Sequence, residues 1–109
     1  MTVAFELDGQ AFTALNGGPD FKFTEAISLV VNCRTQEEVD HFWEKLSAGG
    51  HEVQCGWLQD RFGLSWQVVP SVLVEMLGDK DPEKARHVMA AMLKMTKIRI
   101  DGLQRAYEG

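Results

Sequence analysis

The sequence predicts one α+β domain of 109 residues, built from an N-terminal β-hairpin, a β–α–β–β–β module and a helical tail. Three observations predict this class. Apolar residues alternate with a period of two in residues 2–15, 25–33 and 62–69, which is typical of strands. Residues 35–48 carry an apolar stripe with the period of a helix. After Pro70 the alternation stops and helical patterns follow.

Composition excludes several classes of function. The net charge is −5 and no cluster of Lys and Arg is present, which argues against a nucleic acid partner. No apolar run approaches the roughly 20 residues of a membrane span, and the N-terminus lacks the features of a signal peptide. Cys33 and Cys55 are expected inside strands as reduced thiols, because their spacing does not suit a metal. We therefore expect a soluble cytoplasmic domain that binds no membrane.

Residues 1–18 are expected to form the hairpin. Val3, Phe5 and Leu7 alternate with smaller or polar residues, and Asp8-Gly9 is a strong signal for a hairpin turn. A lone hairpin is only marginally stable in water. The hairpin should therefore pair with another part of the fold or with a partner chain.

Residues 21–69 are expected to form the β–α–β–β–β module. Its first strand is Glu25–Cys33, and the helix that follows begins at Thr35, with Glu38 completing a capping box. Gly49 and Gly50 end this helix. Its apolar stripe consists of Val39, Phe42, Trp43 and Leu46.

Residues 51–69 predict two strands around a Gln59-Asp60-Arg61 turn, with a short preceding limb at residues 52–54. The second strand alternates between two faces. Its bulky face, expected to pack on the helix stripe, comprises Phe62, Leu64, Trp66 and Val68. The opposite face is smaller and partly polar, so we expect it to line a cavity.

Residues 70–109 are expected to form the helical tail. A short helix begins at Pro70 or Ser71 and ends at Gly78. Asp81-Pro82-Glu83 starts a second helix, with Asp as N-cap and Pro in the first turn. Residues 100–107 can form a last helix.

This order of elements is the building block of the vicinal oxygen chelate superfamily, which includes glyoxalase I and extradiol dioxygenases. Three segments resemble its PhnB-like branch, whose members are often labelled 3-demethylubiquinone-9 3-methyltransferase-like. They are FTEAISLVVNC (23–33), TQEEVDHFWEKL (35–46) and QCGWLQDRFGLSWQVVP (54–70), and the tail at 90–98 and 103–107 is similar. The resemblance implies a glyoxalase-like fold.

Members of this branch have two such modules. FELDGQAF (5–12) and ALNGG (14–18) resemble the last hairpin of the first module. The resemblance therefore implies that the start of the first module is missing. It also implies a homodimer, formed through sheet edges or exchanged elements.

Metal-dependent relatives place His or Glu on the first strand of a module and Glu on the last. The corresponding positions here are Ala26 or Ser28, and Gln67. Divalent ions need several converging oxygen or nitrogen ligands, and these residues are poor ones. The histidines, His41, His51 and His87, are expected at the surface or in a loop. We therefore predict no metal and no other cofactor.

The candidate site is the small-residue face of the sheet. Its pocket-lining candidates are Ser28, Val30, Cys55, Trp57, Ser65 and Gln67. A largely apolar surface with few polar groups is typical of small-molecule sites. We expect a metal-independent dimeric domain that binds a small molecule, and leave open whether it is an enzyme.

Two alternatives remain. One is a lyase or dioxygenase of the same superfamily with metal ligands from another chain. The other is a structural module whose exposed hairpin edge recruits a partner strand. A methyltransferase is not expected, because Gly17-Gly18-Pro19 lacks the strand–GxGxxG–helix context of a nucleotide loop.

Overall fold

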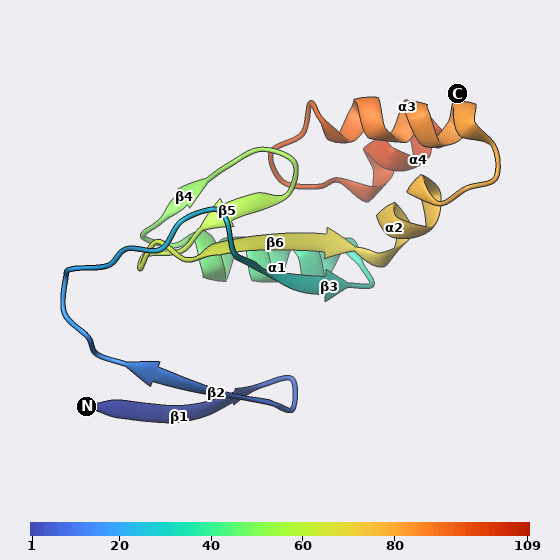
Figure 1. Cartoon of the computed structure of the whole chain (residues 1–109). Helices are drawn as coiled ribbons and strands as arrows, with labels where there is room; N and C mark the ends of the chain where they lie inside the picture. The colour runs from blue at the N-terminus through green and yellow to red at the C-terminus, as the bar shows by residue number, and fades with distance from the viewer.

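The computed structural model describes residues 1–109 and confirms the α+β class, with an N-terminal hairpin, a four-stranded sheet with one helix, and C-terminal helices (Figure 1). The elements are β1 (Thr2–Leu7), β2 (Gln10–Leu15), β3 (Ser28–Cys33), α1 (Gln36–Ser47), β4 (His51–Glu52), β5 (Trp57–Gln59), β6 (Ser65–Pro70), α2 (Ser71–Leu77), α3 (Pro82–Met92) and α4 (Ile100–Glu108). None of the helices is long and apolar enough to cross a membrane.

The main sheet has the strand order β3-β6-β5-β4. β3 pairs with β6 in parallel, whereas β5 is antiparallel to both β6 and β4. A parallel pair needs a crossover connection, and α1 supplies part of it between β3 and β6. The predicted β–α–β–β–β module is therefore confirmed, although β3 begins at Ser28 and not at Glu25.

The start of α1 is capped as its sequence predicts. The Thr35 side chain accepts a hydrogen bond from the Glu38 backbone N–H at 3.2 Å, and the Glu38 carboxylate accepts one from the Arg34 N–H at 2.7 Å. These contacts satisfy N–H groups that have no partner inside the helix. Gly49, with a φ of 78°, follows the end of the helix.

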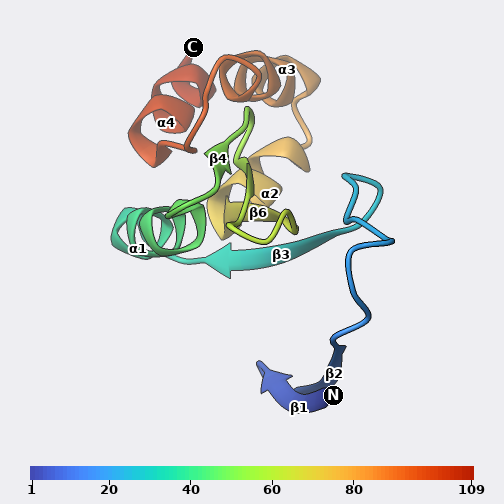
Figure 2. The ribbon, with the colours of Figure 1, turned by 90° about the vertical axis from the view of Figure 1, so that its left-hand side faces the viewer.

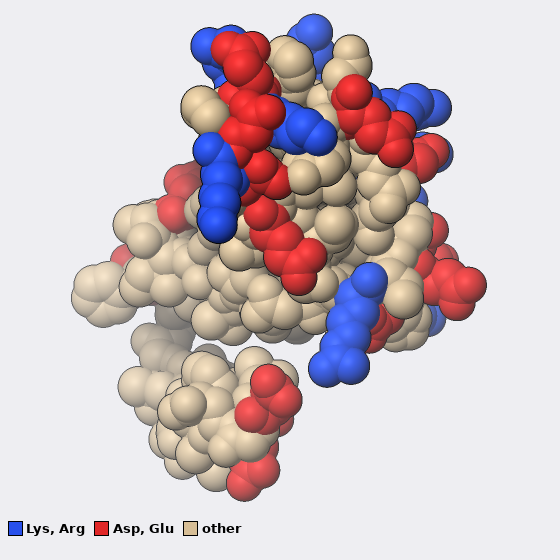
Figure 3. Space-filling view, turned by 90° about the vertical axis from the view of Figure 1, so that its right-hand side faces the viewer, with Lys and Arg blue, Asp and Glu red and all other residues tan.

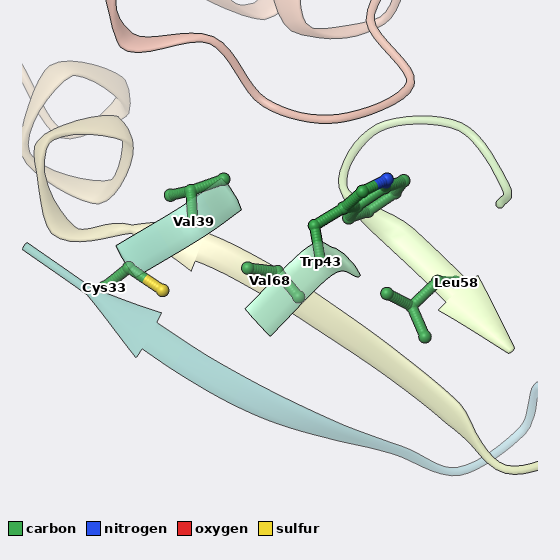
Figure 4. Close-up of a cluster of buried hydrophobic side chains, with 5 residues drawn as sticks. All are labelled: Cys33, Val39, Trp43, Leu58 and Val68. Carbon is green, nitrogen blue, oxygen red and sulfur yellow. The ribbon is translucent and has the colours of Figure 1, made fainter. Parts of the chain in front are cut away.

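The first core lies between α1 and one face of the sheet (Figure 4). Its buried residues are Cys33, Val39, Trp43, Leu58 and Val68, and Trp66 packs against them. The indole N–H of Trp43 donates to the Glu52 carboxylate at 2.9 Å, so this buried ring keeps a polar partner. The predicted packing of the helix stripe on Trp66 and Val68 is confirmed.

The same prediction is wrong for Phe62, whose side chain is 77% exposed. Phe62 lies in the turn between β5 and β6, beneath the Arg61 guanidinium at 5.5 Å from its ring centroid. The turn extends further than its sequence suggested, because the Asp60 carboxylate accepts from the backbone N–H groups of Phe62 and Leu64. Alternation of side chains therefore begins only at Ser65.

A second core holds α2, α3 and α4 together at one end of the sheet (Figure 1). Its buried residues are Leu73, Met76, Val88, Ile98 and Leu103. The tail is joined to the module through main-chain hydrogen bonds from Cys55 N to Met95 O and from Gly56 N to Thr96 O, both 2.8 Å long. The predicted helices of the tail, including the Asp81 N-cap, are confirmed.

The N-terminal hairpin stands apart from both cores. β1 and β2 pair only with each other, and the predicted Asp8-Gly9 turn joins them. In two views at right angles the hairpin lies beyond the β3 edge of the main sheet (Figures 1 and 2). No residue of the hairpin is buried. The expected partner of the hairpin is therefore not found elsewhere in the chain.

Candidate functional site

The candidate site is the face of the main sheet that points away from α1. Leu58 and Val68 point into the first core, so their neighbours along β5 and β6 point to the opposite face. Strand pairing aligns Ser65 with Ser28 and Gln67 with both Val30 and Trp57. We call this surface the open face; it comprises Ser28, Val30, Trp57, Gln59, Ser65 and Gln67.

A polar pair lies at the centre of the open face. The Gln67 side-chain Nε2 donates a hydrogen bond of 2.9 Å to the Ser28 hydroxyl oxygen. This contact leaves the Gln67 carbonyl oxygen free as an acceptor and the Ser28 hydroxyl hydrogen free as a donor. The pair can therefore accept from and donate to the same ligand.

Ser65 is the most unusual residue of the open face. It is 1% exposed, and its hydroxyl oxygen is buried without a hydrogen-bond partner. An unpaired buried polar group costs about 1–3 kcal/mol. A ligand can reach this covered hydroxyl only after a neighbouring side chain moves aside, and a hydrogen bond to Ser65 would then remove this cost.

Apolar side chains flank these polar groups. Val30 is 51% exposed and Trp57 is half-buried, although both are large side chains within strands. The open face therefore combines a few hydrogen-bonding groups with apolar and aromatic area, which is the usual composition of a small-molecule site. It is nevertheless a surface in this chain, and not the enclosed cavity that its sequence suggested.

Two residues at the border of the open face were not predicted. Gln59 Nε2 donates to the Glu25 carboxylate at 3.2 Å, which ties the segment before β3 to β5. The sequence placed Gln59 in a turn and Glu25 within a strand. The spacing of Trp57 and Gln59, two residues apart on one strand, was the signal that could have placed Gln59 on this face.

Cys55 is not part of the open face, because it does not lie in a strand of the sheet. It lies in the turn before β5 with a φ of 62°, and its prediction as a strand residue is wrong. Its position is set by the bond from its N–H to Met95 O. Cys33 is at the end of β3, as predicted. Its burial raises the pKa of its thiol, and the negative charge of the nearby Glu38 raises this pKa further. The Cys33 thiol is therefore a core side chain and a poor nucleophile.

Metal-ligand side chains are not gathered on the open face. No three His, Cys, Asp or Glu side chains of the structure come together in an arrangement that could hold a metal ion. His41, His51 and His87 are all exposed, and His87 lies 3.9 Å from Glu83 across one helical turn. That the protein functions without a metal stays a prediction.

Apart from the open face, the structure has a hollow of about 430 Å³ between α1 and the start of α4. Its charged groups are paired: Lys97 Nζ lies 2.7 Å from the Asp40 carboxylate, and Arg99 lies 3.6 Å from Asp101. Hydrogen bonds from Lys97 and Gln36 lower the pKa of Asp40. Gln36 also donates to Ile98 O at 3.1 Å and accepts from the N–H of Ile100 at 2.7 Å. We interpret this hollow as the joint between the tail and α1.

Comparison with known proteins agrees with this geometry. The family model described as 3-demethylubiquinone-9 3-methyltransferase matches residues 1–69, which include the hairpin and the whole module. The chain belongs to this family. Its PhnB-like, glyoxalase-like character, inferred above from three sequence segments, is thereby confirmed. No curated protein matches the chain.

Two solved structures are similar. The first is a PhnB protein from Bacillus cereus that bears the name 3-demethylubiquinone-9 3-methyltransferase, with 34% identity and a TM-score of 0.60. The match covers 64% of this chain and 64% of that one, so this chain spans less than two thirds of that relative. The second is protein PA1353 from Pseudomonas aeruginosa, with 19% identity, a TM-score of 0.53 and coverage of 64% and 62%. This second match supports the fold alone.

Proposed function

We propose that this glyoxalase-like domain binds a neutral, partly apolar small molecule on its open face, without a metal and as a homodimer. The observation that carries the proposal is the Ser65 hydroxyl, buried without a partner beside the Ser28–Gln67 pair. The hydroxyl groups of Ser28 and Ser65 and the amide of Gln67 thus lie within one largely apolar surface, and each has at least one hydrogen-bonding atom without a partner.

The chemistry of the open face limits the ligand class. Hydroxyl and amide groups recognise carbonyl, hydroxyl or amide groups of a ligand. The charged group at its border, Glu25, is already engaged by Gln59. A charged ligand would lose its hydration without gaining a counter-charge, which is unfavourable. Trp57 and Val30 favour a ligand with a planar or apolar part.

The names of relatives suggest a different activity. The Bacillus cereus protein carries the name of an enzyme that methylates a demethylubiquinone. In the present chain, Gly17 and Gly18 follow β2 and lead into an irregular segment, and not into a helix that could bind a nucleotide-like methyl donor. We therefore favour binding over methyl transfer.

The proposal can be tested with Nile red, a neutral planar dye whose emission shifts to the blue in apolar sites. The full-length protein should bind the dye saturably, and Trp57→Ala should weaken binding by about 5–10-fold, the value of one aromatic contact. Phe62→Ala is the matched control, because Phe62 is an exposed aromatic side chain in the neighbouring turn. Absence of saturable binding, or equal binding by the Trp57→Ala protein, would refute the site.

Metal independence needs its own measurement. Elemental analysis of the purified, assembled protein should find no stoichiometric divalent ion. One zinc, manganese or iron per chain would instead support the lyase or dioxygenase alternative, in which another chain supplies ligands. Dye binding should also persist after treatment with a chelator.

A further inference from the structure

Met95 lies in the joint between module and tail, in the segment that connects α3 to α4. Its carbonyl oxygen accepts the hydrogen bond from the Cys55 N–H at 2.8 Å, and its own N–H donates to Met92 O at 2.9 Å. Its side chain is half-buried and packs against the second core. The main chain of Met95 therefore helps to fix the segment that precedes β5.

The Met95 thioether also takes the place of a helix cap. Arg99 is the N-cap residue of α4 and makes no side-chain capping bond, and its backbone N–H donates to the Met95 sulfur at 3.5 Å. In a capping box, the side chain of the third helical residue satisfies this N–H. In α4 that residue is Gly102, and a Cβ there would lie 2.8 Å from the Met95 methyl carbon. The glycine thus leaves room for the thioether that replaces the cap.

A thioether is a weak acceptor, and peroxide converts it to a polar sulfoxide. The sulfur lone pair attacks one oxygen of hydrogen peroxide, and the O–O bond breaks. The second oxygen takes the proton of the first and leaves as water. Sulfur loses two electrons and peroxide gains them, so the reaction needs no further reactant.

We propose that Met95 is an oxidation site, and that its conversion to the sulfoxide by hydrogen peroxide loosens the tail from the module. The thioether already fills the space between Gly102 and the second core, so an added oxygen forces the side chain out of this place. The Arg99 N–H then loses its acceptor. This inference goes beyond the proposed function and does not depend on a ligand at the open face.

The oxidant can reach this part of the molecule. The surface of the tail carries charged side chains of both signs, as expected of a surface that faces water (Figure 3). Met95 is half-buried, whereas Met76 in the second core is only 7% exposed. Hydrogen peroxide is small and uncharged, so partial exposure of the Met95 side chain is sufficient for the reaction.

A change at Met95 reaches the main sheet through Gly56. The Gly56 N–H donates to Thr96 O, and the Gly56 carbonyl oxygen accepts from the Val68 N–H on β6, both at 2.8 Å. The next residue, Trp57, is the first of β5. Oxidation at the joint therefore acts on the strand that carries the aromatic side chain of the open face.

The test compares thermal unfolding of the full-length protein before and after treatment with hydrogen peroxide. Peptide mass mapping identifies each methionine that has gained one oxygen. The unfolding midpoint of the wild-type protein should fall by about 5–10 °C, the shift expected for the loss of one such contact in a domain of this size. This fall should follow the fraction of Met95 sulfoxide over time. It should not follow oxidation of Met89, which is 41% exposed on α3.

Two conservative variants separate Met95 from its neighbour. Met95→Leu keeps the size of the side chain but cannot be oxidised, so peroxide should shift its midpoint by less than about 2 °C. Met92→Leu is the matched control, because Met92 is also half-buried against the second core but its sulfur accepts no backbone hydrogen bond. The oxidised Met92→Leu protein should lose as much stability as the wild type. If Met95→Leu does not fold, the time course of the wild-type protein still decides.

Reversal identifies the oxidised atom. Methionine sulfoxide reductase should restore the midpoint of the oxidised wild-type protein. Dithiothreitol alone should not, because it reverses disulfides and sulfenic acids of cysteine but leaves methionine sulfoxide unchanged. Recovery with dithiothreitol alone would assign the effect to Cys33 or Cys55 and overturn the proposal.

Hydrogen exchange locates the effect within the fold. The amide protons of Cys55, Gly56 and Arg99 should exchange at least about 10-fold faster in the oxidised protein. Those of Val39 and Trp43, in the first core, should change less. An equal increase at all five amides would show a general loss of stability and would contradict a local effect at the joint.

Three further results would overturn the proposal. One is an unchanged midpoint after Met95 is oxidised, which would show that the sulfoxide oxygen accepts from the Arg99 N–H in place of the sulfur. Another is a Met95 side chain that stays reduced while Met89 is fully oxidised. The last is an equal fall of the midpoint in oxidised Met95→Leu and wild-type protein.

Discussion

The Gln67 side chain on β6 donates a hydrogen bond to the Ser28 hydroxyl on β3, 2.9 Å away across the parallel strand pair. An amide at this position gives the open face a donor as well as an acceptor, whereas a carboxylate would only accept. The contact thus joins two strands and defines the polarity of the candidate site.

We predict that Gln67→Leu destabilises the protein by about 0.5–1.5 kcal/mol, the net value of one hydrogen bond. Urea unfolding measures the change. Ser28→Ala should cost a similar amount, and the double variant should cost less than the sum of the two single variants. Strictly additive free energies would show that the two side chains are not coupled.

Gly56 occupies a position where any side chain would be strained and crowded. Its φ is 82°, and a Cβ there would lie 2.9 Å from the Ile98 side chain and 3.1 Å from the Val68 carbonyl oxygen. Gly56→Ala should therefore destabilise the joint between module and tail by about 2–4 kcal/mol, from backbone strain and overpacking together.

Gly63→Ala is the matched control for Gly56→Ala. Its φ is 88°, but a Cβ there would meet nothing within 4 Å. We expect a loss of about 1 kcal/mol from the backbone conformation alone. Thermal unfolding of both variants should show the larger loss for Gly56→Ala, and equal losses would contradict the close approach of Ile98.

Asp60 organises the turn between β5 and β6. One carboxylate oxygen accepts from the N–H groups of Phe62 and Leu64 at 2.9 and 3.0 Å, and the other accepts from the Trp66 indole at 2.9 Å. Asp60→Ala should cost about 2–3 kcal/mol, because hydrogen bonds to charged groups are stronger than neutral ones. Phe62→Ala, in the same turn, should change the free energy of unfolding by less than about 0.5 kcal/mol. A small loss for Asp60→Ala would show that the turn forms without its carboxylate.

The sequence predicted the local elements well because their signals are local. The capping box of Thr35 and Glu38, the Asp81 N-cap and the Asp8-Gly9 turn each depend on residues within a few positions of one another. The alternation in β3 and β6 assigned Ser28, Val30, Ser65 and Gln67 to one face, and the strand register brings them together. These predictions needed no knowledge of distant contacts.

The errors arise from contacts between residues that local patterns do not connect. Phe62 continued an apolar alternation, but the Asp60 carboxylate holds it in a turn. Cys55 was assigned to a strand, but its N–H bonds to Met95, forty residues later in the chain. The unpaired hydroxyl of Ser65 could not be predicted either, since it depends on what the whole fold places around that side chain.

A pH-sensitive hydrogen bond between Tyr107 on α4 and Asp79 stabilises the position of α4. The Tyr107 hydroxyl donates to the Asp79 carboxylate at 2.5 Å, and Lys84 lies 4.4 Å from the centre of the Tyr107 ring. This hydrogen bond, together with one from the Asp81 N–H, lowers the pKa of Asp79 below its ordinary value of 3.8. The same bond raises the pKa of Tyr107 above its ordinary value of 10.0.

The two shifts place the stabilising effect between two pH limits. A lowered pKa in the folded state means that the Asp79 contribution is present above pH 3.8 and is lost as the pH falls below it. A raised pKa means that the Tyr107 contribution is present below pH 10.0 and is lost as the pH rises through the folded value.

Tyr107→Phe removes the hydrogen bond but keeps the ring for Lys84. The wild-type protein should therefore exceed this variant in urea-unfolding stability most clearly near neutral pH, with the difference shrinking at both extremes. A difference of constant size at every pH would show that Tyr107 stabilises α4 through packing and not through Asp79.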